Sequence, residues 1–293
     1  MNGPQAGYLA DGCRLHLNHG PIDLIVEAFG AEDERRAAYA QAVSRFQTIL
    51  AELVEELPQL RSQAGRASRA FRGSTARRME TAVSPLAQKF ITPMAAVAGS
   101  VADEILAAMI EGRNLEKAYV NNGGDIALHL AGSQTLTLAV AGTGHGFADR
   151  AVIRAADPVR GIATSGWRGR SFSLGIADAV TVLARNGAAA DAAATIIANA
   201  VDLPGHPAIA RVPARELAPD SDLGERLVTT AVGALTENEV AEALALGLAE
   251  AEKLRRAGLI EAAALFLNGE ARVCGVIANI SRPAIREGNF AYA

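Results

Sequence analysis

The chain of 293 residues is 50% hydrophobic and only 4% aromatic, which predicts a large core built mainly from Ala, Val, Leu and Ile. Its formal net charge of −4 argues against a general attraction to nucleic acid or to an anionic membrane. We see neither a secretion signal nor a run that approaches the roughly 18 apolar residues of a membrane-spanning helix. We therefore expect a cytoplasmic protein without nucleic-acid or membrane partners.

The two cysteines lie far apart in the sequence, Cys13 near the start and Cys274 near the end. Each belongs to an apolar run that is typical of a strand. Because thiols of cytoplasmic proteins are usually reduced, we expect both to be unbridged and buried.

A β-hairpin and a long helix are predicted at the start of the chain. Residues 13–17 and 22–28 are apolar runs separated by Asn18-His-Gly-Pro, a sequence typical of turns. From residue 31 to 57 apolar side chains recur at helical spacing, and Pro58 marks the end of the helix.

An arginine-rich stretch follows. Residues 61–78 contain six arginines and no acidic residue. Such a local excess of positive charge could bind a phosphate-bearing ligand. A mobile, solvated loop explains the same composition, and we favour that interpretation.

The middle of the chain has a conspicuous glycine turn. Pro93 opens a helix of small side chains that runs to about residue 106. Two predicted strands, 118–120 and 126–130, then flank Asn121-Asn-Gly-Gly-Asp. Adjacent glycines allow positive φ angles and expose backbone amides. Asp125, which ends this turn, is either an ordinary turn residue or a carboxylate of a binding site.

Further strands are predicted at residues 135–141, 151–155, 162–164 and 177–183. The loop 142–147 is rich in glycine, but its spacing is not that of a dinucleotide-binding turn. A helix then carries Asp191 and Thr195.

Asp191 and Thr195 are four residues apart, so a carboxylate and a hydroxyl share one helix face. Together they could hold a hard cation, a phosphate or both. Alternatively, Asp191 complements the helix dipole and Thr195 bonds back to a helix carbonyl. From the spacing alone, this structural interpretation is the favoured one.

Residues 202–226 are rich in Pro, Asp and Gly, which predicts a long irregular excursion that acts as a lid or as a contact between copies in a homo-oligomer. Thr236 and Glu239 form a capping box for a helix that ends at Arg256. A last hairpin is predicted from residue 259 to 277. Hairpins and long helices without a sustained βαβ repeat predict a single α+β domain over residues 1–293.

Four motifs in a fixed order resemble the ApbE-like superfamily, which includes FAD:protein FMN transferases, and they most resemble its small uncharacterised cytoplasmic branch. The motifs are Pro93-Met-Ala-Ala-Val-Ala-Gly, Asn121-Asn-Gly-Gly-Asp-Ile, Ala163-Thr-Ser-Gly, and Ala177-Asp-Ala-Val-Thr-Val-Leu-Ala followed by Ala190-Asp-Ala-Ala-Ala-Thr. The resemblance implies a tandem T-fold-like α+β fold that binds FAD, or a related flavin nucleotide, and Mg²⁺ in a cleft.

The resemblance also implies roles for individual residues. Asp191 and Thr195 match metal ligands of the transferases and are the expected catalytic residues. The flavin site would contain Asn122, Gly123, Gly124, Asp125, Thr164, Ser165 and Gly166. The implied reaction is attack by a Ser or Thr hydroxyl of an acceptor protein on the FAD pyrophosphate, which releases AMP.

Two departures from the transferase pattern favour binding over transfer. The transferases' Ala-Lys-Gly-aromatic stretch aligns with Ala98-Gly-Ser-Val, so its lysine is absent. Their His-Ile-x-Asp-Pro element is replaced by Arg170-Ser-Phe-Ser-Leu-Gly-Ile. The alternative function is therefore a non-catalytic protein that binds a flavin or a pterin-like ligand.

Overall fold

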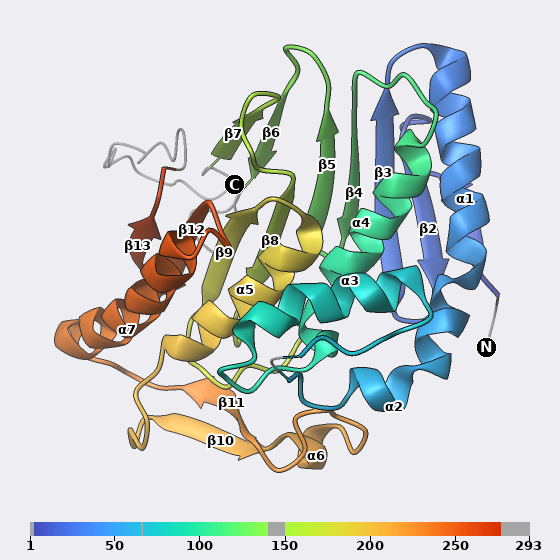
Figure 1. The fold of residues 1–293 in the computed structure, drawn as a ribbon. Coiled ribbons are helices and arrows are strands. Elements are labelled where there is room, and N and C mark those ends of the chain that lie inside the picture. The colour runs from blue at the N-terminus through green and yellow to red at the C-terminus, as the bar shows by residue number, and fades with distance from the viewer. Residues whose placement is uncertain (1–2, 66, 140–149, 277–293) are drawn as a thin grey trace, which may run out of the picture.

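A computed structural model describes residues 3–65, 67–139 and 150–276 (Figure 1). Nine of the described strands form one sheet, whose spatial order follows the chain. They are β1 (Gln5–Tyr8), β2 (Leu15–His19), β3 (Ile22–Phe29), β4 (Lys117–Asn122), β5 (Asp125–Leu130), β8 (Gly161–Ser165), β9 (Ala179–Ala184), β12 (Ala262–Leu267) and β13 (Glu270–Cys274). Every neighbouring pair in this sheet is antiparallel.

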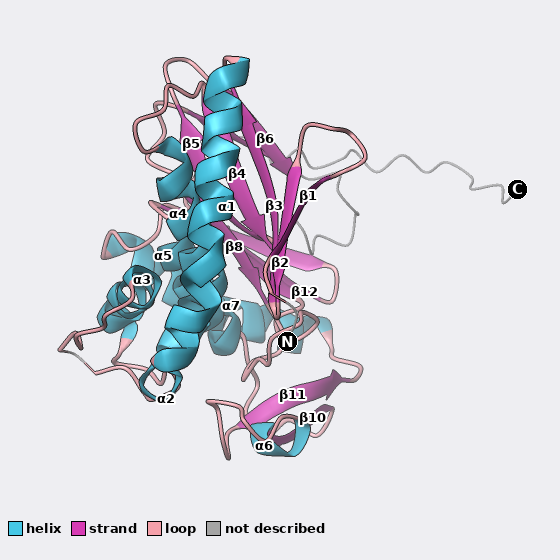
Figure 2. Ribbon diagram, turned by 90° about the vertical axis from the view of Figure 1, so that its right-hand side faces the viewer, coloured by secondary structure: helices cyan, strands magenta, loops and turns pink. Residues whose placement is uncertain are grey.

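The long helices lie together on one face of the sheet (Figure 2). They are α1 (Glu32–Glu55), α3 (Ser74–Val83), α4 (Val97–Ile110), α5 (Gly187–Ala200) and α7 (Glu237–Arg256), and shorter turns are α2 (Leu57–Leu60), η1 (Ser84–Leu86) and η2 (Pro93–Ala96). This arrangement confirms the predicted α+β class. The order β2, β3, α1, α4, β4 and β5 is repeated by β8, β9, α5, α7, β12 and β13, with β1, α3 and shorter elements as additions, which fits a tandem arrangement.

The two halves of the sheet join at β5 and β8 through only two register pairs, Ile126 with Ile162 and Ala127 with Gly161. Next to these pairs the strands part. There the backbone N–H of Thr164 donates to the Asp125 carboxylate at 3.1 Å. At this end of the seam between the halves a carboxylate therefore takes the place of a backbone partner, whereas at the other end the Leu128 N–H still donates to the Arg160 carbonyl oxygen at 2.9 Å.

On the face opposite the long helices, β6 (Thr135–Ala139) pairs with β7 (Arg150–Arg154). A second apolar cluster, separate from the main core, lies there and includes Leu128, Ile153 and Leu183. The predicted loop 142–147 lies outside the described residues, as do the last residues of the predicted strands 135–141 and 271–277.

The excursion predicted to be irregular is partly regular, so that prediction was incomplete. It contains β10 (Ile209–Pro213) and α6 (Ala214–Leu217), and β10 pairs with β11 (Leu227–Val232) below the main sheet (Figure 1). The partner strand lies beyond the segment itself. Pairing between distant residues therefore provides the order that local composition does not indicate.

The solvated-loop interpretation of residues 61–78 was wrong for its later part, because α3 begins at Ser74. Two of its arginines pair with buried acids. Arg69 lies 2.7 Å from Glu80, and Arg78 lies 2.8 Å from Glu104. Since a buried carboxylate is costly without a partner, these arginines stabilise the packing of the helices.

The prediction for the cysteines holds for Cys274, which is buried, and fails for Cys13, which is exposed. Cys13 precedes β2 and lies in a turn, where its backbone N–H donates to the Asp11 carboxylate at 2.9 Å. The apolar run therefore begins to pair two residues later than its composition suggests.

Residues Pro93–Ile110 are long and apolar enough to cross a membrane by length and composition alone. Sequence inspection did not identify this stretch. In the structure 61% of it is buried, and α4 packs between α1 and α5, as expected of a core helix.

The capping box is confirmed at the start of α7. The Glu239 N–H donates to the Thr236 hydroxyl at 3.3 Å, and the Thr236 N–H donates to the Glu239 carboxylate at 2.7 Å. Two of the unpaired donors at the helix end are thus satisfied.

Candidate functional site

A cavity of about 980 Å³ opens at the seam where β5 and β8 part. It is lined by the β4–β5 turn, the end of β8 with the loop that follows, the start of α4, one face of α5, and the excursion. All nine residues singled out in the sequence line this seam cavity: Asn122, Gly123, Gly124, Asp125, Thr164, Ser165, Gly166, Asp191 and Thr195. The structure brings them together, and their functional roles stay predictions.

Helix α5 positions Asp191 at the seam cavity. The helix begins where the Asn186 side chain accepts the N–H of Ala189 at 2.8 Å. Asp191 lies one turn later, and its Oδ2 accepts the N–H of Gly99, near the start of α4, at 3.0 Å. Asp191 therefore satisfies a backbone donor that α4 cannot pair internally.

The reverse contact is made by Asp103 on α4. Its two carboxylate oxygens accept the N–H groups of Gly187 and Ala188, at the start of α5, each at 2.8 Å. Each helix thus carries an aspartate that caps the other. Neither contact was identified from the sequence, where Asp103 was not singled out.

Reciprocal capping requires the two helix backbones to lie very close. A Cβ added to Gly99 would lie 2.2 Å from the carbonyl oxygen of Gly187, and one added to Gly187 would lie 2.9 Å from that of Gly99. Only glycine fits at these two positions. The small residues of α4 therefore serve helix packing at this crossing.

Asp125 lies across the seam cavity at the start of β5. The turn before it holds Gly123 and Gly124 at φ angles of 64° and 115°, which L side chains rarely adopt. The Asp125 carboxylate accepts the Thr164 N–H, and the Thr164 hydroxyl lies 2.9 Å from that of Thr181. Asp125 is thus a turn residue whose carboxylate also faces the cavity.

Both cavity carboxylates lie in surroundings that make their ionised form unfavourable. Burial raises the pKa of Asp125 to about 7, although the nearby Arg170 guanidinium opposes this shift. Burial raises the pKa of Asp191 well above its usual range, and the negative charge of Asp125 raises it further. A cation between them would relieve both effects.

Asp125, Asp191 and Thr195 offer only oxygen atoms, the ligands that Mg²⁺ prefers. Within the described residues, no group of three or more His, Cys, Asp or Glu side chains could enclose a metal ion. Mg²⁺ usually completes its shell with water and substrate phosphates. These residues therefore fit a hard cation that is bound jointly with a phosphate-bearing ligand.

The excursion adds wall residues that sequence reasoning missed. Asp220, Asp222 and Leu223 line the seam cavity. The Thr92 hydroxyl donates to the Asp222 carboxylate and so links the excursion to the residue before η2. The Asp-rich composition of this segment was a signal, but nothing local indicated which residues it would face.

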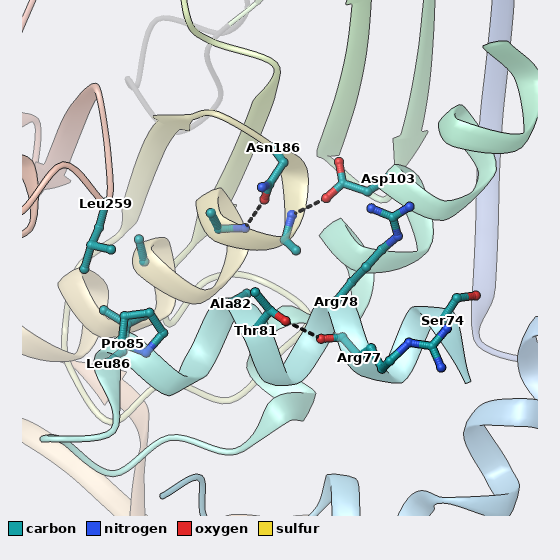
Figure 3. A pocket seen from close by; sticks show the side chains of 13 residues that line it. Ser74, Arg77, Arg78, Thr81, Ala82, Pro85, Leu86, Asp103, Asn186 and Leu259 are labelled. Atoms are coloured by element: carbon teal, nitrogen blue, oxygen red, sulfur yellow. Dashed lines mark hydrogen bonds between the residues drawn. The ribbon is translucent and has the colours of Figure 1, made fainter. Parts of the chain in front are cut away.

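A second cavity of about 480 Å³ lies between α3 and the start of α5, with Asp103 of α4 at its edge (Figure 3). Figure 3 shows Asp103 and Asn186 bonded to the α5 backbone, with the Arg78 guanidinium beside Asp103. The donors at this helix end are thus taken by the protein's own side chains. We assign this cavity no ligand.

Comparison with known proteins gave three kinds of match. A family model described as "AbpE bacteria" matches residues 6–273 and bears out the resemblance to the ApbE-like superfamily. A UPF0280 protein of Methanothrix thermoacetophila is 38% identical over 113 residues, which cover 38% of this chain and 46% of that protein. For a UPF0280 protein of Archaeoglobus fulgidus the values are 36% over 111 residues, covering 38% and 45%.

These matches therefore span less than half the length of the curated relatives. Among solved structures, the apo form of Pseudomonas stutzeri flavinyl transferase ApbE aligns over 92% of this chain and 93% of that chain, with a TM-score of 0.44 and 10% identity.

Proposed function

The chain belongs to the AbpE bacteria family, and on that premise we propose that its seam cavity binds a flavin nucleotide together with a divalent cation. One observation carries the proposal. Two carboxylates and a hydroxyl, from β5 and α5, line one cavity of about 980 Å³ beside two glycine turns. A volume of this size suits a ligand as large as a dinucleotide.

Each group has a defined part in this proposal. Asp191, Thr195 and Asp125 would hold Mg²⁺, which when bound would offset negative charge on phosphate oxygens. Gly124 carries no side chain, and no atom lies within 4 Å of the position that its Cβ would take, so this wall of the cavity stays open to a bulky ring.

We further propose that the site transfers FMN. A Ser or Thr hydroxyl of an acceptor protein would attack the FMN-side phosphorus of FAD. A new P–O ester bond forms, the pyrophosphate P–O bond breaks, and AMP leaves with its electron pair. The hydroxyl proton passes to water, because a carboxylate that helps to hold Mg²⁺ is ionised and only weakly basic.

A second candidate, binding of a flavin or pterin-like ligand without transfer, is favoured by one observation at the start of α4. The lysine that the transferases carry aligns with Gly99. A Cβ there would lie 2.2 Å from the Gly187 carbonyl oxygen, so this helix crossing has no room for a lysine. If transfer depends on that lysine, the chain binds its ligand and leaves it intact.

The two candidates differ in one product. Purified protein is incubated with FAD, Mg²⁺ and a Ser- or Thr-containing acceptor, and AMP and flavin-labelled protein are measured. AMP release that is lost in Asp191→Asn supports transfer. Tight FAD binding without AMP supports the binding function, and no FAD binding at all contradicts both.

A further inference from the structure

The loop after β8 carries a cationic side chain at the seam cavity. Gly169, Arg170 and Phe172 of this loop line the cavity. A Cβ added to Gly123 would lie 1.9 Å from Nη2 of Arg170 and 3.1 Å from its Cζ. The guanidinium therefore sits directly on the Gly123 backbone, at a place that is open only because residue 123 has no side chain.

Arg170 differs from the arginines that stabilise the helices. Arg45, Arg69 and Arg78 each form an ion pair with a carboxylate at 2.7 to 2.9 Å. Arg170 is exposed, and within residues 3–65, 67–139 and 150–276 it has no such pair and no hydrogen bond of its side chain. Its donors are thus available to a molecule in the cavity.

The charges of the cavity explain what this arginine can do. When ionised, Asp125 and Asp191 repel an anion, as do Asp220 and Asp222 of the same lining. Arg61 and Arg170 are the arginines of this lining, and a guanidinium offers paired N–H donors that match two oxygens of a phosphate. Arg170 is close enough to Asp125 for its charge to lower the pKa of that carboxyl. A positive charge therefore lies beside the two acids at the seam cavity.

We propose that Arg170, seated on Gly123, binds a phosphate group of the cavity's ligand and makes the site select phosphorylated over unphosphorylated forms of that ligand. The choice of flavin as the ligand rests on the proposed function. The choice of phosphate rests on the position and free donors of Arg170. Arg170 thus acts as a specificity-determining residue.

The test compares riboflavin, FMN and FAD, which share one ring and differ in phosphate content. Affinities are measured by fluorescence quenching with Mg²⁺ present for the unchanged protein, Arg170→Gln and Arg170→Lys. The control is Arg185→Gln, since Arg185 is 72% exposed and lies outside the seam cavity. Melting temperatures check that each variant is folded.

We expect Arg170→Gln to weaken FMN and FAD binding by about 10- to 100-fold and to change riboflavin binding by less than about 2-fold. Arg170→Lys should lie between, because lysine keeps the charge and loses the paired geometry. An equal loss for all three ligands, or no loss, overturns the proposal.

ADP and inorganic pyrophosphate separate this proposal from the flavin assignment. If the unchanged protein binds no flavin but binds ADP or pyrophosphate more tightly than Arg170→Gln does, the flavin function fails and the role of Arg170 stands. If the unchanged protein binds none of these compounds, both fail.

Discussion

Asp103 and Asp191 each cap the neighbouring helix where α4 and α5 cross, yet they lie in different electrostatic surroundings. Asp103 places both oxygens on backbone N–H groups of α5, with Arg78 beside it (Figure 3). Asp191 bonds the Gly99 N–H and faces the carboxylate of Asp125 across the seam cavity. Asp103 has a backbone donor on each oxygen and the Arg78 charge nearby, although Arg78 itself pairs with Glu104, whereas Asp191 faces a second carboxylate and lines the larger cavity.

This difference separates a packing role from a binding role. Burial raises the pKa of both acids, so the ionised form of either carboxylate is unfavourable at its place in the fold. At Asp103 the protein provides the compensation itself. At Asp191 the compensation is left to a bound cation, which is the physical reason to expect a ligand there.

Replacing Asp191 by Asn should have the largest effect on binding. An Asn side chain can still accept the Gly99 N–H, so α4 keeps its cap, but the negative charge is lost. We expect the Mg²⁺-dependent part of flavin binding to fall by about 100-fold or more, with a small change in stability. Calorimetric titration with Mg²⁺ and FAD measures this.

Asp191→Ala serves as the matched control, because it removes both the charge and the cap. If Asp191→Asn binds Mg²⁺ and FAD as tightly as the unchanged protein does, Asp191 is only a helix cap, as Asp103 is.

Replacing Asp103 by Ala should produce the opposite pattern. Two backbone N–H groups of α5 would lose their partner inside the protein. We expect a loss of about 3 kcal/mol in the free energy of unfolding, measured by urea denaturation, and ligand affinity of the folded fraction within about 3-fold of normal. A large loss of ligand affinity with an unchanged free energy of unfolding would mean that Asp103, and not Asp191, has the binding role.

The pH dependence of the ligand-free protein sharpens the comparison. In the folded protein the pKa of Asp125 is raised to about 7, so its protonated form favours the folded state. This contribution to the free energy of unfolding is fully present below the ordinary pKa of an aspartate and is lost as the pH rises through 7. Asp191 and Asp103, whose pKa values are also raised, act in the same direction. The melting temperature should therefore fall by about 5 °C between pH 5 and pH 8.

Asp125→Asn should make the melting temperature depend less on pH. Added Mg²⁺ should raise the melting temperature of the unchanged protein at pH 8. Glu239 and Asp11, whose pKa values are lowered to about 2, lose their contribution only under more acidic conditions and do not disturb this range. A melting temperature that rises from pH 5 to pH 8 contradicts the account.

The smallest effect concerns the two cysteines. Cys13 is exposed, whereas Cys274 is buried and its thiol pKa is raised to about 11 by burial. A thiol reagent at pH 8 should therefore modify Cys13 alone in the folded protein, as checked by intact mass. Cys13→Ser should abolish the labelling and leave flavin binding unchanged, and labelling of native Cys274 would contradict the packing of β13.

Much of the fold could be predicted because its signals are local. Helical spacing marks α1, turn residues mark the first and last hairpins, and the capping box marks the start of α7. The convergence of Asp125 and Asp191 followed only from the order of the motifs and their resemblance to a family. Spacing alone favoured an Asp191 that complements the dipole of its own helix, whereas the structure places it beyond the first turn of α5, where it caps α4.

What could not be predicted depends on contacts between distant residues. The pairing of Arg69 with Glu80, the β10–β11 hairpin and the reciprocal caps of Asp103 and Asp191 each join segments whose separate sequences suggest nothing of the partner. In the sequence, Arg170 stood out only as the first residue of the segment that replaces the transferases' His-containing element, because its position on Gly123 is a tertiary contact.

The central claim is that Asp191 is left uncompensated so that a cation and a flavin nucleotide can bind at the seam cavity. Crystals grown with FAD and Mn²⁺, in place of Mg²⁺, test it directly through the anomalous signal of the metal. The account predicts a metal peak at coordinating distance from the Asp191 carboxylate, with FAD phosphate oxygens beside it. A flavin bound elsewhere, or a seam cavity without metal when FAD is present, would contradict it.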